Sequence, residues 1–571
     1  MPRRTVFWTL AALAVLAAAG QAYWLRWTCD DAFISFRYAQ HFVEGHGLVF
    51  NLDPLEAPVE GYTNFSWTML LALGLQFGFA DRGLEQWSIF WGILAHAGTV
   101  LLLAMVAWRV SGGRALVPIA ACGYAAIHHA SSLAPAGLET ALFVLLMTAM
   151  LRFCLALRCA REAWLLGFLG VLTAMTRPDG AIPVAVSGLF VLHDAWRRRA
   201  PRLLVGYVVP FLVVFVPYLL WRHAYYGEWV PNTFFAKSGS DPFVAAGWSY
   251  VRDFFLCYWS LPLAFVPLLV FVVMKPDLLA TISPFLGRRP WIAIGAFVGS
   301  YLGFVLWVGG DFMFGRFLLP ILPTLLLALD LACQRWRALW LQPALGGLVV
   351  LGCVFRVEPP GLHDHLKVVS DNRTISFHPV VENGPPIADV YRMAGEYLQR
   401  LFAGLDVRLA IAGGHANFAY RSHVPIAIEC AGGLTDAHIA RLTPLVRGKP
   451  GHDKPRDRAY LERRGVHFML ELNFEGEFGK VDTWRDVNFA APPLGFPMRL
   501  VTWDRALMRE LLRRDPHIHV QDFEQFLDAY LADLPNKTKQ QVRADYDKFV
   551  PFYFARNDDP ARRQRFEAFL R

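Results

Sequence analysis

The feature that most constrains this chain is a series of long apolar runs that fills its first 355 residues and then stops. Each run approaches the roughly 20 residues that a helix needs to cross the hydrocarbon core of a bilayer. The runs lie at about 7–24, 86–108, 115–134, 138–157, 163–176, 181–196, 203–221, 254–274, 291–308, 317–333 and 338–355. The sequence therefore predicts a polytopic α-helical membrane protein with about eleven transmembrane helices.

The N-terminal run follows a short basic leader, "MPRR", and ends in small residues, which is also typical of a cleaved signal peptide. Against cleavage, residues 7–24 are long enough to span a membrane and lead directly into a polar stretch without a spacer. We therefore expect an uncleaved first helix with Arg3 and Arg4 in the cytoplasm. The apolar stretch at 66–79 is too short to count and is predicted to be interfacial or re-entrant.

The charge pattern indicates an orientation in the membrane. The net charge is +8, and most arginines lie in short clusters between the apolar runs, such as the cluster at 197–202. Basic clusters of this kind mark cytoplasmic loops, so the charge predicts no nucleic-acid partner. The eight cysteines are scattered without a CxxC pair and predict neither a disulfide framework nor a zinc site.

After residue 355 the composition changes. Residues 356–571 are polar and rich in charge, with β-like stretches at 407–413 and 466–472 and helical patterns at 500–514 and 521–534. We expect two domains: a transmembrane catalytic domain at 1–355 and a soluble α/β domain at 356–571. With an odd number of spans, the second domain lies outside the cytoplasm, where it caps the site or binds an acceptor.

The polar motifs gather in the loops that this topology places on the extracytoplasmic side. The densest is the first loop, about 28–65, which contains Asp30 and Asp31 in "TCDDAFISFRYAQHFVEGHG". Adjacent carboxylates need a cation, a basic side chain or a shared proton nearby. One aspartate could act as a general base while the other orients an acceptor or holds a metal. The structural alternative is that Asp30 caps the following helix and Asp31 pairs with Arg37.

The other loop motifs also have structural alternatives. In "PAGLET", Glu139 precedes a helix, where an acid favours the helix dipole. In "TRPDG", Arg177 could grip a phosphate or a neighbouring acid. In "GGDFMFGRF", Asp311 and Arg316 could form a local salt bridge. The motifs "VEGYTNFSW", "YYGEWVPNTFFAK" and "GHDKP" add further polar candidates, namely Glu60, Tyr62, Asn64, Asn232, Lys237 and His452.

Taken together, these motifs resemble one family of membrane enzymes. The stretches "DDAFISFRYAQHFVEGHGLVFN", "VEGYTNFSW", "GLETALF", "TRPDG", "YYGEWVPNTFFAK", "GGDFMFGRFLLPILP" and "GLTD…GHDKP" are similar to a family of integral-membrane glycosyltransferases of the GT-C type. Its best-known members are the terminal β-(1→2)-arabinofuranosyltransferases of mycobacterial cell-wall synthesis. The resemblance covers about residues 28–470.

The resemblance implies a GT-C fold and an extracytoplasmic active site that uses a polyprenyl-phosphate sugar donor. Carried over by motif, Asp30 or Asp31 is the catalytic base of an inverting transfer. The same motifs imply that donor phosphate is bound by Arg37, Arg177, Lys237 and Arg316. They imply sugar or acceptor binding by Glu60, Tyr62, Asn64, Glu139, Asn232, Asp311 and His452.

The function predicted in this way is transfer of a sugar, with arabinofuranose as one candidate, to an envelope glycan, glycolipid or protein at a bacterial inner membrane. No Walker, GxSxG, HExxH or GxGxxG motif is present, in agreement with a lipid-linked donor. No cofactor is implied with certainty, and a divalent cation stays open, with Asp30 and Asp31 as its candidate ligands. The alternatives are a transporter or flippase of lipid-linked sugars and a non-catalytic subunit of an envelope-assembly complex.

The predicted orientation can be tested with a reporter fused after Arg571, active on only one side of the membrane. An extracytoplasmic signal is expected, because the odd span count places the C-terminal domain opposite the N-terminal arginines. A cytoplasmic signal would mean that the span count is wrong.

Overall fold

The computed structural model describes residues 3–237, 242–267, 270, 289–335, 339–363, 369–377, 386–411, 416–444, 454–470, 483–489 and 496–571. The chain divides into two compact units that are interleaved in sequence. The first, here called the helical unit, comprises Met1–Ser35, Thr63–Trp229 and Gly239–Ile375. The second, the mixed unit, comprises Phe36–Tyr62, Val230–Ser238 and Ser376–Arg571.

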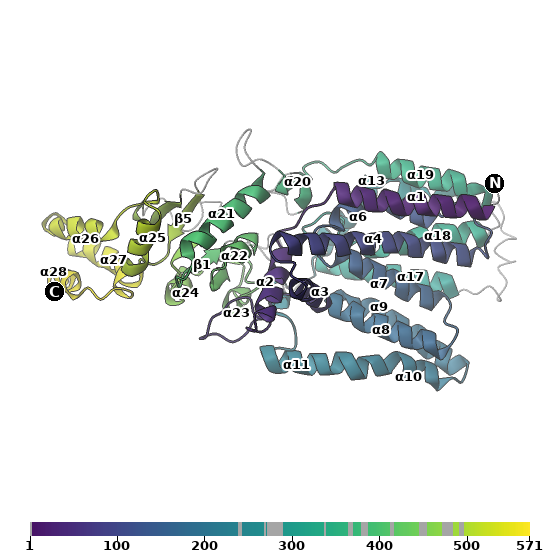
Figure 1. Ribbon diagram of the computed structural model, residues 1–571, viewed down its shortest axis with the longest axis horizontal. Coiled ribbons are helices and arrows are strands. Elements are labelled where there is room, and N and C mark those ends of the chain that lie inside the picture. The colour runs from purple at the N-terminus through teal and green to yellow at the C-terminus, as the bar shows by residue number, and fades with distance from the viewer. Residues whose placement is uncertain are drawn as a thin grey trace. The chain divides into compact units, whose positions relative to one another are not determined.

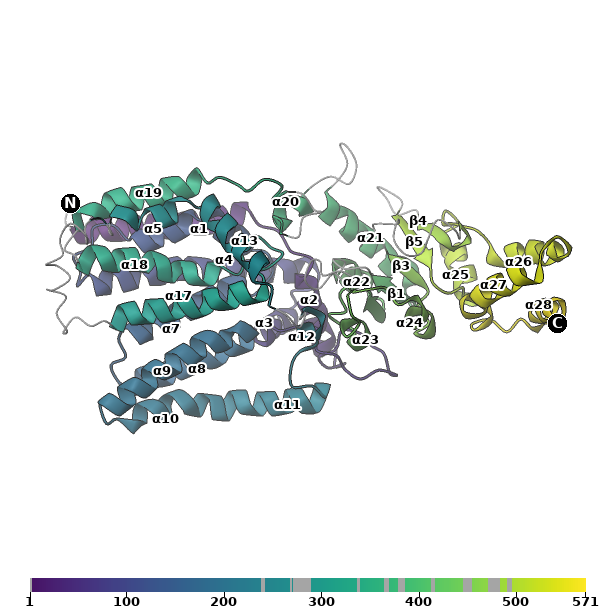
Figure 2. The same ribbon diagram turned by 180° about the vertical axis from the view of Figure 1, so that it is seen from behind.

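The helical unit is a bundle whose long helices run side by side, as Figures 1 and 2 show from opposite directions. Its longer helices are α1 (Arg3–Trp24), α3 (Phe65–Gln76), α4 (Arg82–Val110), α7 (Thr140–Leu155), α8 (Ala160–Thr176), α9 (Ala181–Arg197), α10 (Pro201–Pro210), α11 (Val216–Tyr226), α13 (Val244–Cys257), α17 (Arg289–Val308), α18 (Leu322–Arg335) and α19 (Gln342–Val354). Short helical turns complete it: α5 (Ile119–Ala126), α6 (His128–Leu133), η1 (Pro178–Gly180), η2 (Phe211–Phe215), α14 (Ser260–Leu263), η4 (Leu319–Ile321), η5 (Leu339–Leu341) and α20 (Asn372–Ser376).

Within the described residues, four helices are both long and apolar enough to cross a membrane: Arg3–Trp24, Arg82–Val110, Pro201–Tyr226 and Arg289–Val308. Four shorter helices are also apolar: Phe65–Gln76, Thr140–Leu155, Leu319–Gln334 and Leu339–Val354. The apolar helices confirm a polytopic helical membrane protein, whereas the predicted count of eleven spans is not confirmed. The end of the run predicted at 254–274, namely 268–269 and 271–274, lies outside the described residues.

Two predicted spans differ in detail from the structure. The run at 115–134 is not one helix, because Ile127 is extended between α5 and α6, and α5 begins only after Pro118. The span predicted at 203–221 is one long helix, but its central turn, η2, is a π-helix that follows Pro210. A proline cannot donate the backbone hydrogen bond of a regular turn, which explains the local change of winding.

Small residues let the helices of this unit approach one another closely. One buried cluster comprises Ala22 of α1, Ala95 of α4, Ala134 just after α6, and Ala141 of α7. Gly92 of α4 lies so close to the chain at Ala134 that a β-carbon added there would be 2.0 Å from the Ala134 carbonyl oxygen. Packing through small residues is typical of helices in membranes, where apolar burial alone gives little driving force.

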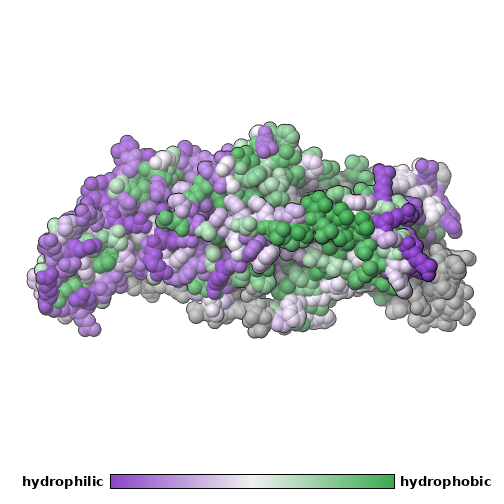
Figure 3. Space-filling model, turned by 90° about the horizontal axis from the view of Figure 1, so that it is seen from below, coloured by the Kyte–Doolittle hydropathy of each residue, from purple (hydrophilic) through white to green (hydrophobic). Residues whose placement is uncertain are grey.

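The outer surface of the helical unit is apolar. Large exposed side chains include Leu16 of α1, Phe90 and Leu101 of α4, and Leu189 of α9. Figure 3 shows hydrophobic side chains gathered over this part of the molecule. An exposed apolar surface of this extent is expected where lipid, and not water, surrounds the helices.

The mixed unit contains a sheet whose described strands are β1 (Arg408–Ile411), β2 (Ile426–Glu429), β3 (Phe468–Leu470), β4 (Asp486–Phe489), β5 (Phe496–Leu500) and β6 (His519–Val520). The strand order is β2-β1-β3-β5-β4-β6. β1 pairs in parallel with β2 and β3, and the remaining pairs are antiparallel. β1 lies within the β-like stretch predicted at 407–413, and β3 within the one predicted at 466–472.

The helices of this unit include α2 (Ala32–Val43), which begins in the helical unit, and α12 (Asn232–Lys237). The others are α21 (Ile387–Phe402), α22 (Ala416–Ser422), α23 (Ala437–Ala440), α24 (Arg458–Arg463), η7 (Thr483–Arg485), α25 (Arg505–Arg514), α26 (Phe523–Ala532), η8 (Leu534–Asn536), α27 (Lys539–Phe549), η9 (Val550–Phe554) and α28 (Pro560–Leu570). Ile426, Ile428 and Met469 of the sheet pack with Ile439 and Leu461 in the core.

The close approach at Gly92 predicts a specific sensitivity. Gly92→Ala is expected to destabilise the helical unit by about 2 kcal/mol or more, because the added methyl group overlaps backbone atoms that cannot move aside. The matched control is Gly299→Ala in α17, where an added β-carbon meets nothing within 4 Å. Thermal unfolding of the purified protein in detergent measures both, and equal melting temperatures would contradict the packing described here.

Candidate functional site

A buried carboxylate, Glu139, joins three separate segments of the helical unit. Its Oε2 accepts a hydrogen bond from Nδ2 of Asn64 at 3.0 Å. Its Oε1 accepts from Nη1 of Arg177 at 3.1 Å and from Nη2 of Arg316 at 3.3 Å. Asn64 precedes α3, Arg177 follows α8, and Arg316 lies between α17 and η4.

The ionisation of Glu139 follows from these contacts. Burial by itself raises the pKa of this carboxyl, but the guanidinium groups of Arg316 and Arg177 outweigh burial and hold the pKa below its ordinary value. Glu139 precedes α7 and lies outside the apolar helices. It is therefore a carboxylate at neutral pH, and both arginines face a negative charge.

Arg177 is fully engaged. Besides Glu139, its guanidinium bonds both oxygens of Asp179, at 2.9 Å from Nε and 3.1 Å from Nη2. Tyr301 of α17 donates its hydroxyl to Asp179. The rings of Phe143 and Phe317 flank the guanidinium at 5.2 and 5.1 Å. Arg177 is thus held rigidly. Its partner Asp179 is the neighbouring acid that the sequence analysis gave as one alternative to phosphate.

Arg316 has hydrogen-bonding capacity left over. Its Nη1 lies 3.5 Å from Oδ2 of Asp311, the local ion pair that the sequence also offered. Its Nε is buried and has no hydrogen-bond partner in the described part of the chain, and neither has Oδ2 of Asp311. Burial lowers the pKa of Arg316, but Asp311, Glu139 and Asp31 together raise it. An anionic group could therefore find a charged donor here.

The loop that carries Arg316 is fixed by a tyrosine that the sequence reasoning missed. Tyr250 of α13 donates its hydroxyl to the Met313 carbonyl at 2.9 Å and accepts from the Phe317 amide at 3.2 Å. Gly310 has φ +85° and packs against the Tyr250 ring so closely that a β-carbon would lie 2.6 Å away. Ser370 pairs with the backbone of the same loop through Phe312 and Phe314. Nothing in the local sequence singled out Tyr250, which precedes the apolar run predicted at 254–274.

Asp30 and Asp31 form the turn between α1 and α2, where their carbonyls accept the first hydrogen bonds of α2. Both side chains are partly buried. Burial and then the charges of Asp31 and Asp30 raise the pKa of the Cys29 thiol, and the charge of Arg316 opposes them. Asp31 also acts on Arg316. Asp31 therefore lies within electrostatic range of Arg316, and both aspartates lie within that range of Cys29.

Backbone contacts hold this turn in place. The Cys29 amide donates to the Ala136 carbonyl at 2.9 Å. The Trp67 indole donates to the Gly137 carbonyl, also at 2.9 Å. Gly137 has φ +81°, and a β-carbon there would lie 2.9 Å from Ala32. The chain that carries Asp30 and Asp31 is therefore packed on the loop that ends in Glu139.

The remaining predicted site residues lie in the mixed unit, and several have evident structural contacts. Arg37 of α2 is buried and donates to the carbonyls of Phe50, Ala419, Val424 and Pro425. Burial lowers its pKa to about 10. These contacts support a structural role and not the phosphate contact or the pairing with Asp31 that the sequence suggested.

Other predicted residues of this unit are also tied to its backbone. Asn232 donates to the carbonyls of Gly433 and Leu434 at 2.8 and 2.9 Å. Its backbone amide donates to the Glu60 carbonyl at 3.0 Å. Tyr62 is buried with its ring 4.7 Å from that of Tyr38.

Lys237 is exposed at the end of α12. His452 lies outside the described residues. No group of three or more histidine, cysteine or acidic side chains suited to a metal ion occurs among the residues that the structure describes.

The apolar helices and the buried polar cluster at their ends define a multi-pass membrane protein. Within that class, the chain is similar to two curated proteins, each named terminal β-(1→2)-arabinofuranosyltransferase. It is 30% identical to the Mycobacterium tuberculosis protein over 64% of this chain and 63% of that one. It is 30% identical to the Corynebacterium glutamicum protein over 57% of this chain and 52% of that one. The resemblance inferred from the motifs is confirmed, although the match spans less than two thirds of either relative.

No family model matches the chain. Among solved structures, ArnT from Cupriavidus metallidurans bound to undecaprenyl phosphate aligns with a TM-score of 0.44 at 14% identity, over 75% of this chain and 87% of that one. Its apo form aligns with a TM-score of 0.46 at 14% identity, over 81% and 92%. TM-scores below 0.5 do not establish a common fold.

The ion pairs of Glu139 predict a stability effect. Glu139→Gln is expected to destabilise the helical unit by about 3 kcal/mol, because it leaves buried guanidinium groups short of a counter-charge. Since the pKa of Glu139 is lowered on folding, the lost stability is present above its unfolded value of about 4.3 and disappears as the pH falls through the folded value. Thermal unfolding against pH should therefore show wild type losing its advantage over Glu139→Gln in acid. The exposed Glu228→Gln is the control, and a pH-independent difference would contradict the ion-pair account.

Proposed function

We propose that this protein is a membrane glycosyltransferase that moves a sugar from a polyprenyl-phosphate donor to an acceptor hydroxyl of the cell envelope. The observation that carries the proposal is the buried Arg316, whose Nε lacks a partner in the described chain and whose neighbours include the charge of Asp31. The names of the two relatives supply the reaction type, with arabinofuranose as the first sugar to test. The acceptor is an envelope glycan, glycolipid or protein.

The donor half of the reaction needs a cation. When the bond between the anomeric carbon and phosphate breaks, the polyprenyl phosphate leaves with an additional negative charge. Arg316 is poised to stabilise that charge in a site from which bulk water is largely excluded. Arg177 contributes a second positive charge, and Glu139 together with Asn64 holds the two arginines in register.

The acceptor half needs a base. In a single displacement, the acceptor oxygen bonds to the anomeric carbon, its proton passes to a carboxylate, and the configuration inverts. We assign that base to Asp30 or Asp31, since both form the turn beside Cys29 and the charge of Asp31 reaches Arg316. Asp311, with one carboxylate oxygen lacking a hydrogen bond in the described chain, is assigned to the sugar hydroxyls.

The proposal also specifies where in the cell the transfer takes place. A lipid-linked sugar lies at the bilayer surface, and the polar cluster lies at the ends of apolar helices. We place the site on the extracytoplasmic face of a bacterial inner membrane, following the arginine clusters of the opposite loops.

The test replaces Asp30 and Asp31 separately with Asn and measures transfer from a synthetic polyprenyl-phosphate sugar in membranes. At least one variant is expected to lower kcat by about 100- to 10,000-fold, the usual contribution of a general base. Arg316→Gln is expected to impair departure of the phosphate and to lower kcat/KM for the donor. The control is Asp81→Asn, at an exposed turn before α4.

Full retention of transfer by both aspartate variants would overturn the catalytic assignment. Movement of lipid-linked sugar across the bilayer without transfer would instead identify a flippase. A wild type with neither activity, and whose loss nevertheless disables an envelope-assembly complex, would be a non-catalytic subunit.

A further inference from the structure

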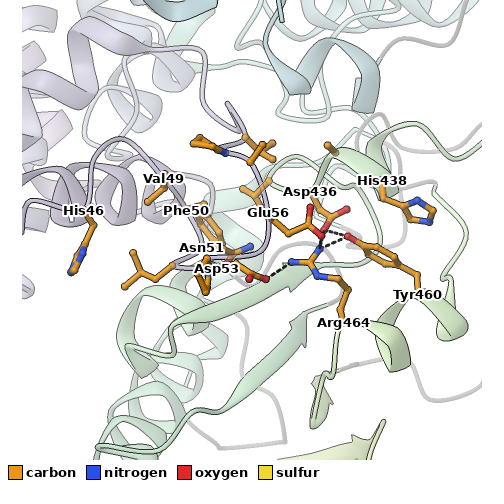
Figure 4. A pocket seen from close by; sticks show the side chains of 17 residues that line it. His46, Val49, Phe50, Asn51, Asp53, Glu56, Asp436, His438, Tyr460 and Arg464 are labelled. Carbon is orange, nitrogen blue, oxygen red and sulfur yellow. Dashed lines mark hydrogen bonds and ion pairs between the residues drawn. The ribbon is translucent and has the colours of Figure 1, made fainter. Parts of the chain in front are cut away.

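The mixed unit contains a pocket of about 430 Å³ that the proposed transfer reaction does not use. We call it the mixed-unit pocket (Figure 4). One wall is formed by residues 46–59, and the other by residues 435–438 together with Tyr460 and Arg464. Its volume falls in the range of about 300–1,000 Å³ that is usual for small-molecule sites.

Arg464 occupies the centre of the polar side of the pocket. Its Nη2 donates to Oδ2 of Asp53 at 2.7 Å, and its Nη1 lies 3.3 Å from Oδ2 of Asp436 and 3.4 Å from Oε1 of Glu56. Three carboxylates surround one guanidinium, so the group carries a net negative charge. An anionic ligand is therefore repelled here.

The carboxylates are held in fixed orientations. Asp53 also accepts from the Leu55 amide at 3.0 Å, and Asp436 accepts from the Ile439 amide at 2.9 Å and from the Tyr460 hydroxyl at 2.8 Å. Although burial raises the pKa of Asp53, the Leu55 amide and Arg464 hold it below its ordinary value. Oriented carboxylates are acceptors suited to hydroxyl groups, and Glu56, half exposed, has the greatest freedom to meet a ligand.

An aromatic pair and apolar side chains complete the lining. The rings of His438 and Tyr460 stack with centroids 4.1 Å apart and planes 23° apart, and His438 is exposed. Its Nε2 lies 3.0 Å from Oδ2 of Asp457, which fixes the ring. Val49 and Phe50 add apolar surface. A pocket with acceptors on one side and flat or apolar surface on the other matches a sugar ring, which has a hydroxylated edge and a C–H face.

We propose that the mixed-unit pocket binds an uncharged saccharide and serves as the acceptor-glycan site of the enzyme. The part of this inference that concerns the acceptor rests on the proposed glycosyltransferase function, whereas saccharide binding itself does not.

The test measures binding of neutral oligosaccharides to the full-length protein in nanodiscs by saturation-transfer NMR and calorimetry. The probes are an arabinofuranose tetrasaccharide, maltotetraose and inorganic phosphate. At least one saccharide is expected to bind, and inorganic phosphate is expected not to compete. Glu56→Gln and His438→Ala should each weaken that binding about tenfold, the loss expected when a hydrogen bond to a charged group or an aromatic contact is removed.

The controls are Glu44→Gln and His517→Ala, which change exposed side chains of the same types in the same unit but outside the pocket. Glu56 and His438 are also exposed, and His438→Ala removes the stacking of its ring on the buried Tyr460. Saccharide binding that is equal in pocket and control variants, or no saccharide binding at all, would overturn the inference.

The transfer assay separates this inference from the proposed function. If wild type transfers sugar, the pocket variants should raise the acceptor KM about tenfold and leave donor KM unchanged, and an unchanged acceptor KM would overturn the pocket assignment alone. If saccharide binds and is weakened by the pocket variants while wild type transfers nothing, the binding site stands and the transferase proposal fails.

Discussion

The helical unit depends on the ion pairs that keep the buried carboxylate of Glu139 ionised. A buried ion costs several kcal/mol unless it is paired and hydrogen-bonded, and Glu139 meets two guanidinium groups and an amide. Those partners come from the chain before α3, after α8 and after α17, so one charge ties three loops together. The turn with Asp30 and Asp31 is packed on the Glu139 loop through backbone contacts. Removing the Glu139 ion pairs would remove the contacts that hold the proposed donor-binding and base residues near one another.

The sequence was informative about the apolar helices and the polar loops between them, because apolar length and loop polarity are local properties. Each site residue alone admitted a structural alternative, and the structure contains two of those alternatives: the Arg177–Asp179 and Arg316–Asp311 pairs. These local pairs are compatible with the cluster around Glu139, because each arginine contacts both its local acid and Glu139. Glu139 is separated from Arg177 by 38 positions in the chain and from Arg316 by 177 positions. Their contact is a tertiary property that no spacing rule reveals.

Other contacts and breaks in the structure left no signal in the sequence. Arg37 stands in a motif beside two aspartates, yet it donates to backbone carbonyls of the mixed unit, a role for which sequence gives no signal. Tyr250 was overlooked because it lies outside both the apolar runs and the polar loop motifs, although its hydroxyl fixes the loop of Arg316. The run at 115–134 looked continuous because hydropathy does not register an extended residue such as Ile127.

The interleaving of the two units has a consequence for the order in which the protein is made. Arg37 bonds the carbonyl of Ala419, which lies 382 residues later in the chain. At a synthesis rate of about 5–20 residues per second, roughly 20–80 seconds pass before that partner exists. During this interval the segment Phe36–Tyr62 has left the ribosome without the sheet on which it folds. A fragment beginning at residue 376 would lack this segment altogether, so the C-terminal region is an incomplete part of a fold begun much earlier.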